Sequence, residues 1–243
     1  MALFWPSWYT TAMAGPLTDY EIYIRTEELL ALQKKPEQLV THDEMQFQVV
    51  HQVAELWMKL CAHEVDRLMA LLREDDACRA QYTLKRIAQI QRLLEAQLSL
   101  LDTMSPKDYM TIRTALGRGS GQESPGFKHL LKVPKDIWAA WKGMLDRRRV
   151  TLRHIYEQPE QHAELHALAE GLTDFDQALQ LWRWRHLMLV YRIIGAGTPS
   201  LKGKPVDILE RGVRERFFPE LWEVRDQVFE EWTKQSKKDM GYH

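Results

Sequence analysis

Residues 41–73 read THDEMQFQVVHQVAELWMKLCAHEVDRLMALLR and carry a long helical pattern. Apolar side chains recur along this stretch every three or four residues, which is the spacing of one face of an α-helix. They are Val49, Val53, Leu56, Trp57, Leu60, Val65, Leu68 and Leu72. Thr41 and Glu44 have the spacing of a capping box, so we expect this helix to begin beside them and to end near Arg73.

The same periodicity recurs along the rest of the chain, between turns rich in glycine and proline. It predicts helices over 17–33, 77–104, 105–117, 134–156, 173–194, 205–213 and 219–232. Two glycine-rich stretches, 117–126 and 197–204, are predicted to be loops. The sequence shows no alternating strand pattern, internal repeat or linker between domains. It therefore predicts an all-α fold, a bundle of long antiparallel helices.

Composition places the chain among ordinary globular proteins. The 243 residues are 45% hydrophobic and 28% charged, which excludes disordered and collagen-like chains. A chain of this length fits one domain or at most two. We expect an N-terminal arm over 1–16, a single all-α domain over 17–233 and a C-terminal tail over 234–243.

Charge and cysteine content narrow the choice of partners and compartment. Lys plus Arg number 33 against 34 Asp plus Glu, so no overall field attracts nucleic acid or an anionic membrane. No run approaches the roughly 20 apolar residues of a membrane span. Cys61 and Cys78 lack metal-ligand spacing, and the N-terminus lacks the basic start of a secretory signal. These features favour a cytoplasmic protein that binds neither nucleic acid nor membrane.

Two histidines fall on the predicted core-facing sides of separate helices. His51 lies one turn from Phe47 and one turn from Glu55. His186 belongs to an apolar stripe formed by Phe175, Leu179, Trp182, Leu189 and Ile193. A histidine that faces a core is more often a hydrogen-bonded structural residue. A pair on two long helices can instead ligate a haem, or one can ligate it while the other faces a bound gas or substrate.

A second group of residues suits an amino-acid ligand. Tyr109 and Arg113 are one turn apart on the short helix before a predicted loop, and a guanidinium is a planar fork that matches a carboxylate. Ser120 and Gly121 in that loop, with Thr198 in the other, offer hydroxyl and backbone groups. A surface arginine packed over a tyrosine has the same spacing, so the pattern alone leaves both interpretations open.

Several segments, in order along the chain, resemble those of the tryptophan 2,3-dioxygenase family. They are YEIYIRTEELLALQ at 20–33, FQVVHQVAELWMK at 47–59, MSPKDYMTIRTAL at 104–116, the Ser120-Gly121 start of a loop, LWRWRHLMLVYRIIG at 181–195 and FFPELWEVR at 217–225. Together they span most of the chain, from 20 to 225. The resemblance implies an all-α fold with haem b bound between helices, and L-tryptophan or a related indole amino acid and O2 as substrates.

The resemblance also implies roles for individual positions. His186 matches the axial ligand of the haem iron, His51 the histidine that hydrogen-bonds the indole nitrogen, and Arg113 the residue that pairs with the substrate carboxylate. Further matches to substrate-binding positions are Phe47, Tyr109, Leu116, Ser120, Gly121 and Thr198. Residues that family members insert into a neighbouring subunit's site are matched by Tyr20, Tyr23 and Ile24, which implies a homotetramer built as a dimer of dimers.

The activity that the resemblance implies is haem-dependent insertion of O2 across the indole 2,3 bond of L-tryptophan, or of a substituted tryptophan, to give N-formylkynurenine. One loop departs from the family, because 197–203 reads GTPSLKG where the family has glycine-threonine-glycine-glycine-serine. Pro199 restricts the backbone there. This change motivates an alternative, a haem-dependent monooxygenase or rearrangement enzyme acting on a modified tryptophan or indole in a biosynthetic pathway. A third hypothesis is a non-catalytic haem or helical interaction protein.

Overall fold

The computed structural model describes residues 16–117, 119, 121–196 and 207–240, which form helices and loops with no strand among them. In chain order the α-helices are α2 (Asp19–Ile24), α3 (Thr26–Leu30), α4 (Asp43–Arg73), α5 (Ala77–Ala96), α6 (Leu98–Leu101), α7 (Pro106–Ala115), α8 (Pro125–Arg148), α9 (Leu152–Glu157), α10 (Ala163–Ile193), α11 (Asp207–Arg214) and α12 (Pro219–Asp239). Short 3₁₀ turns, η1 (Pro36–Gln38) and η2 (Gly121–Glu123), lie in the connections. The predicted all-α fold is confirmed.

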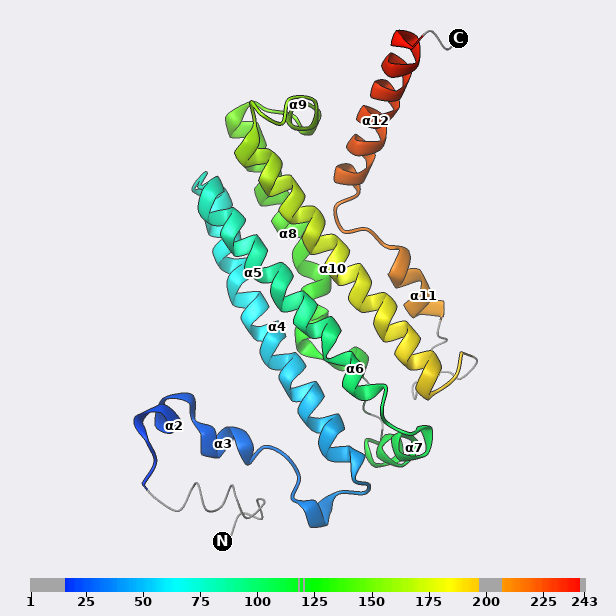
Figure 1. The fold of residues 1–243 in the computed structure, drawn as a ribbon. Coiled ribbons are helices and arrows are strands. Elements are labelled where there is room, and N and C mark those ends of the chain that lie inside the picture. Colours follow the sequence, from blue (N-terminus) through cyan, green and yellow to red (C-terminus); the bar gives the residue numbers. More distant parts are fainter. Residues whose placement is uncertain (1–15, 118, 120, 197–206, 241–243) are drawn as a thin grey trace.

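The long helices α4, α5, α8 and α10 make an antiparallel bundle (Figure 1). α5 packs on both α4 and α10, and α8 packs on α4. Each of these helices turns an apolar face inward, and removal of those faces from water stabilises the bundle. Because successive long helices run in opposite directions, α4 and α8 begin, and α5 and α10 end, at the lower end of the bundle in Figure 1.

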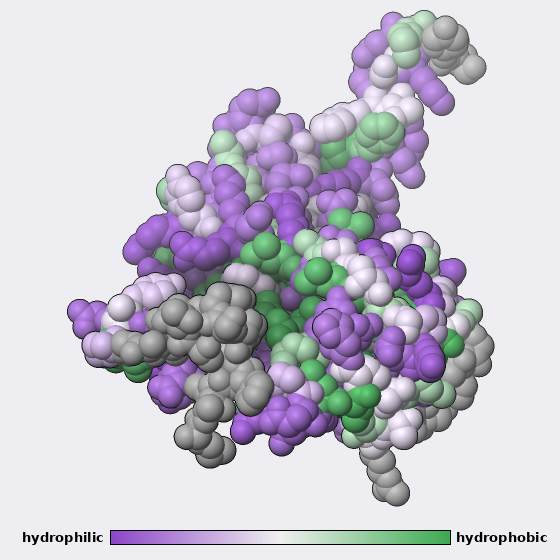
Figure 2. Space-filling model, turned by 60° about the horizontal axis from the view of Figure 1, so that its bottom comes forward, coloured by the Kyte–Doolittle hydropathy of each residue, from purple (hydrophilic) through white to green (hydrophobic). Residues whose placement is uncertain are grey.

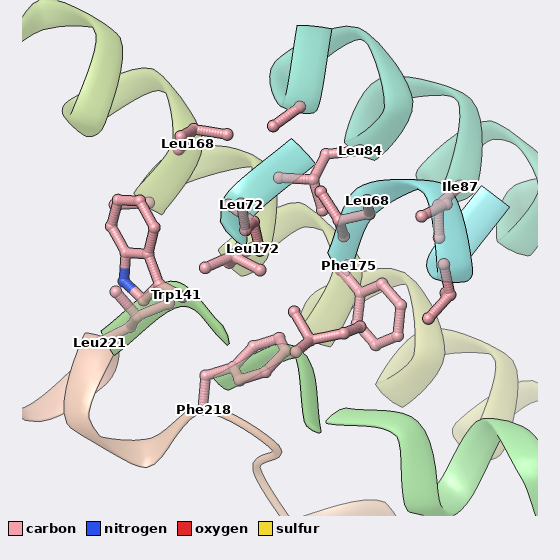
Figure 3. Packing of buried hydrophobic residues seen from close by; sticks show 14 of the residues in the cluster. Leu68, Leu72, Leu84, Ile87, Trp141, Leu168, Leu172, Phe175, Phe218 and Leu221 are labelled. Carbon is pink, nitrogen blue, oxygen red and sulfur yellow. The ribbon is translucent and has the colours of Figure 1, made fainter. Parts of the chain in front are cut away.

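The main hydrophobic core lies where the long helices face one another (Figure 3). Trp141 of α8 and Phe175 of α10 are fully buried in it. Phe218, the residue before α12, and Leu221, in the first turn of α12, pack in the same core although they lie near the end of the chain. Complete burial of each such side chain contributes about 1.5–3 kcal/mol. The core therefore fixes the long helices and the start of α12 relative to one another.

The predicted helix over 17–33 is wrong, because the structure divides it into α2 and α3. The break is at Arg25, whose backbone is left-handed with a φ of 56°. A left-handed residue cannot continue a right-handed helix. α2 begins with a capping box that the sequence analysis missed, in which Glu21 N–H donates to Thr18 Oγ1 and Thr18 N–H donates to the Glu21 carboxylate.

The predicted capping box of Thr41 and Glu44 is also wrong. α4 begins at Asp43, after His42, and no side chain caps it. The buried Glu44 carboxylate instead accepts from Lys34 Nζ at 2.6 Å and from the Val40 N–H at 2.8 Å. These two donors occupy both oxygens of the carboxylate, and the bond from the charged Lys34 is the stronger because both of its partners carry charge. Glu44 thus ties the preceding segment onto α4.

Other predicted boundaries move although the helices exist. Pro134 lies inside α8 rather than at its start, and Thr173 lies inside α10, where its hydroxyl donates to the Ala169 carbonyl. The predicted helix over 77–104 is divided at Gln97 into α5 and α6. α12 extends through Asp239 into the predicted tail. Among the described helices, none combines the length and apolar character that crossing a membrane requires.

A buried carboxylate fastens the chain that follows the 197–204 stretch to α10. Asp176 is fully buried and accepts hydrogen bonds from the Phe217 N–H and from Trp222 Nε1, the latter at 2.9 Å. Two turns further along α10, Arg183 donates to the Gly212 carbonyl at 2.6 Å and lies over the Phe217 ring. A buried charge is tolerated only with such partners, so these bonds specify where α11 and α12 begin relative to α10.

Replacement of this carboxylate should destabilise the fold. Asp176→Ala leaves buried donors without an acceptor, and we expect the free energy of unfolding to fall by about 3 kcal/mol or more. Asp174→Ala, on the exposed side of the same turn, is the matched control and should change it by less than about 0.5 kcal/mol. Urea unfolding monitored by circular dichroism measures both; equal midpoints for the two variants would contradict the role of Asp176.

Candidate functional site

The lower end of the bundle in Figure 1 carries a second, smaller hydrophobic cluster that joins α4, α6, α7 and α10. Its buried members are Val50, Leu98, Leu101, Met104, Ile112 and Leu189. Phe47, Tyr109 and Trp182, each one turn from a predicted site residue, pack against it. The cluster therefore brings predicted site residues of three separate helices to one end of the bundle.

His51 is held by its own helix in one tautomer. Its Nδ1 lies 2.7 Å from the Phe47 carbonyl oxygen. A carbonyl oxygen only accepts, so Nδ1 carries the proton and Nε2 keeps a free lone pair. His51 is exposed on one side, so the prediction that it faces the core is wrong. Burial of its other side lowers the pKa of His51, although the Phe47 hydrogen bond and the Glu55 charge act in the opposite direction. The ring is therefore neutral at pH 7.

His186 lies on α10 and is half-buried. The Trp182 ring stacks on it with 5.2 Å between the ring centroids and an angle of 4° between the planes. Burial lowers the pKa of His186 to about 4, and repulsion from the His51 ring, when that ring is protonated, adds to the shift. A neutral imidazole with an available lone pair is the form that ligates iron.

Aromatic and basic side chains continue the site onto α7. The Phe47 ring lies 4.0 Å from the His51 ring and 6.4 Å from the Tyr109 ring, measured between centroids. Burial raises the pKa of Tyr109, and the positive charge of Arg113 opposes that shift. Arg113 is only 9% exposed, so it is not the loose surface arginine of the alternative interpretation. Leu116 ends α7 and is partly exposed.

The face of the molecule at this end of the bundle is hollowed. Figure 2 shows hydrophobic side chains gathered in a depression of the face seen when the lower end of the bundle is turned forward. Two neutral imidazoles, each one turn from an aromatic residue of the smaller hydrophobic cluster, suit a flat, largely apolar group with one metal centre, such as haem. His186, the more buried of the two, is the residue suited to hold its iron.

A separate groove lies between α4 and α8, towards the opposite end of the bundle. It is lined by Met69, Arg73, Asp136, Ala139, Ala140, Gly143 and Arg147. None of the predicted site residues lines it, and its walls carry no histidine. We therefore assign the functional site to the lower end.

The structure does not bring all predicted residues to the site. Tyr20, Tyr23 and Ile24 lie on α2 and are 70%, 87% and 40% exposed. Gly121 begins η2, in the loop that follows α7. Ser120 and Thr198, with the whole 197–203 stretch, lie outside the described residues.

Residues that the sequence analysis did not select also belong to this end of the bundle. Trp182 stacks on His186, and Phe127 packs on Trp182 with 4.8 Å between their centroids. Glu55 binds the start of α8 through Ser124 and Gly126. One feature of the sequence could have indicated Glu55: it is a charged residue one turn from His51 on a largely apolar face. Its partners, far along the chain, could not be inferred from that spacing.

The lowered pKa of His186 predicts how the stability of the haem-free protein depends on pH. The unfolded ring binds a proton near its ordinary pKa of 6.5, but the folded ring binds one only near 4. Between these values the unfolded state holds more protons, so acid favours unfolding. We expect the free energy of unfolding to fall as pH drops from 6.5 to about 4, by up to about 3 kcal/mol.

Two variants separate this effect from general acid unfolding. His186→Gln should flatten the dependence between pH 6.5 and 4, because it removes the titrating ring. His63→Gln changes an exposed histidine of α4 and should leave the dependence as in the wild type. Urea unfolding at a series of pH values gives the slopes. A slope for His186→Gln as steep as the wild type's would show that His186 is not the group responsible.

Comparisons with known proteins agree with this geometry. The family model described as tryptophan 2,3-dioxygenase matches residues 10–133. The tryptophan 2,3-dioxygenase of Myxococcus xanthus is 31% identical over 90% of this chain and 92% of its own length. That of Serratia proteamaculans is 30% identical over 86% of this chain and 93% of its own, and that of Xanthomonas euvesicatoria 31% over 90% of each. The resemblance seen in the sequence is confirmed: the chain belongs to the tryptophan 2,3-dioxygenase family of oxidoreductases.

Proposed function

We propose that this protein is a haem-dependent dioxygenase that inserts both atoms of O2 across the indole 2,3 bond of L-tryptophan and forms N-formylkynurenine. The observation that carries the proposal, beyond family membership, is the pair of neutral imidazoles, His51 and His186, on two helices that the smaller hydrophobic cluster joins. Both oxygen atoms end in the product, and the indole supplies the electrons, so turnover consumes no external reductant.

Haem b would bind at this end of the bundle, where His186 would hold it through its iron. When bound, the haem supplies the ferrous centre at which dioxygen is activated. The chain's part is to keep the ligand available and oriented. The low pKa of His186 keeps its lone pair free of a proton at pH 7. The stacked Trp182 ring limits rotation of the imidazole, so His186 is preorganised to coordinate.

His51 would orient the indole. Because its Nδ1 is committed to the Phe47 carbonyl, its Nε2 can accept the indole N–H. The Phe47 ring beside it offers an apolar face for the indole to pack on. Addition of O2 to the ring does not require removal of the indole proton first. His51 therefore acts in our proposal by holding the substrate rather than by taking a proton.

Arg113 would hold the other end of the substrate. Its fork matches the carboxylate of an α-amino acid, and Tyr109 and Leu116 line the approach to it. Ser120, Gly121 and Thr198 complete the proposed pocket through their match to family positions. Fixing both ends of L-tryptophan orders the reacting atoms before reaction, which lowers the entropic part of the barrier.

The exposed N-terminal helix supports a proposed homotetramer. Tyr20 and Tyr23 on α2 present apolar surface to solvent within a single chain. With Ile24, they match the positions that family members insert into a neighbouring subunit's active site. In our proposal the same residues cover the substrate end of another subunit's hollow, and their burial there contributes to assembly.

The reaction itself is tested by the fate of the oxygen atoms. The reduced holoprotein is mixed with L-tryptophan under isotopically heavy O2, and the product is analysed by mass spectrometry. We expect N-formylkynurenine with two heavy atoms, formed over many turnovers without added reductant. Incorporation of a single heavy atom would instead support the monooxygenase alternative that the GTPSLKG sequence at 197–203 suggests.

The role of His51 is tested with a substrate that lacks the indole N–H. Wild-type protein should prefer L-tryptophan over 1-methyl-L-tryptophan, because only the former donates to Nε2. In His51→Ala this preference, expressed as a ratio of kcat/KM values, should fall by roughly tenfold while turnover persists. His63→Ala, an exposed histidine on the same helix, is the control. An unchanged ratio in His51→Ala would remove the proposed hydrogen bond from the mechanism.

A further inference from the structure

Glu55 makes the closest polar connection between α4 and the start of α8. Its Oε1 accepts from the Ser124 hydroxyl, and its Oε2 accepts from the Gly126 N–H at 3.2 Å. The same Ser124 oxygen accepts from the Phe127 N–H at 3.0 Å and so caps α8. The first N–H groups of a helix have no partner inside it. Glu55 and Ser124 together satisfy two of them, and the negative charge favours the positive end of the helix.

The first turn of α8 lies directly on α4 at this point. A Cβ added to Gly126 would lie 2.7 Å from Met58 Cβ and 2.8 Å from Glu55 Oε2. Both distances are shorter than atoms of real side chains tolerate, and Met58 is buried. Only glycine therefore permits this approach, so the contact is built into the packing of the two helices rather than left to surface side chains.

Aromatic contacts extend this connection to α10. Phe127, the residue after Gly126, packs on Trp182 with 4.8 Å between the ring centroids. Trp182 in turn stacks on His186 at 5.2 Å. Glu55 itself lies one turn beyond His51 on α4. A continuous series of contacts thus runs from the helix of one site histidine, through the start of α8, to the ring of the other.

We propose that Glu55 is a positioning residue that holds the first turn of α8 on α4 and, through Phe127 and Trp182, sets how His186 lies relative to His51. This inference rests on the proposed function, since it assigns Glu55 a part in arranging the haem and substrate sides of the same site. Glu55 then also holds the end of the connection between α7, the helix that carries Arg113, and α8. Loss of the carboxylate loosens both the α8 turn and the Trp182 stack.

The test compares Glu55→Ala with Glu64→Ala in the holoprotein. Glu64 is a buried carboxylate of α4, whereas Glu55 is half-buried, and Glu64 pairs with Arg86 at 2.8 Å, away from the site. In Glu55→Ala we expect amide hydrogen exchange at Gly126 and Phe127 to accelerate by about tenfold or more. We also expect kcat/KM for L-tryptophan to fall by about tenfold, and the Soret band to shift without being lost. Glu64→Ala should lower the melting temperature but leave these three quantities unchanged.

Two further variants separate positioning from a general loss of stability. Ser124→Ala removes the other half of the connection, so its effect on kcat/KM should not add to that of Glu55→Ala in the double variant. Glu55→Gln keeps the size and one acceptor, and we expect it to restore part of the exchange protection. Fully additive losses, or equal exchange at Gly126 and Phe127 in Glu55→Ala and Glu64→Ala, would overturn the proposal.

The readouts also separate this proposal from the proposed function. If the wild type does not oxidise L-tryptophan but Glu55→Ala still accelerates exchange at Gly126 and shifts the Soret band, the positioning role stands and the reaction assignment is wrong. If the wild type forms N-formylkynurenine and Glu55→Ala does so with the same kcat/KM, the reaction assignment stands and the positioning role is wrong.

Discussion

The packing of α4 against both α5 and α8 is the constraint on which the rest of the structure depends. In its C-terminal half, Leu68 and Leu72 lie in the main core. In its N-terminal half, the turns that carry Phe47, His51 and Glu55 line the end of the bundle, with only part of their surface covered. A single rigid helix therefore relates the core to the site. This arrangement places the site side chains on an element whose position is fixed by burial elsewhere.

Low polarity is what makes the two histidines chemically useful. Charged imidazoles are disfavoured where protein removes water, so His51 and His186 are neutral at pH 7. Neutrality has a different consequence for each. On His186 it leaves a lone pair suited to a metal, and on His51 the Phe47 carbonyl decides which nitrogen keeps its lone pair. The same desolvation thus yields a ligand on one helix and a hydrogen-bond acceptor on another.

The periodicity of apolar residues was sufficient to predict the all-α fold and the partly buried position of His186, because burial of one face leaves a regular signal in the sequence. It was wrong for His51, which is exposed. It was not sufficient where a polar group had two possible partners. Glu44 pairs with Lys34 rather than capping α4. The left-handed backbone of Arg25 could not be predicted either, because an arginine gives no indication of that conformation. The connection of Glu55 to Ser124 was likewise invisible, because it joins residues far apart in the chain and depends on how α8 approaches α4.

The bonds that Asp176 and Arg183 make to residues 212–222 also bear on how this protein can evolve. These bonds hold the residues that follow the GTPSLKG stretch on α10. The residues that precede the stretch belong to α10 itself, so the chain is fixed on both sides of it. Chain between two such fixed points can change in sequence or length at small entropic cost. Substitutions there therefore need not disturb the packing of the bundle, so this stretch can diverge in sequence while the helices that surround the core are retained.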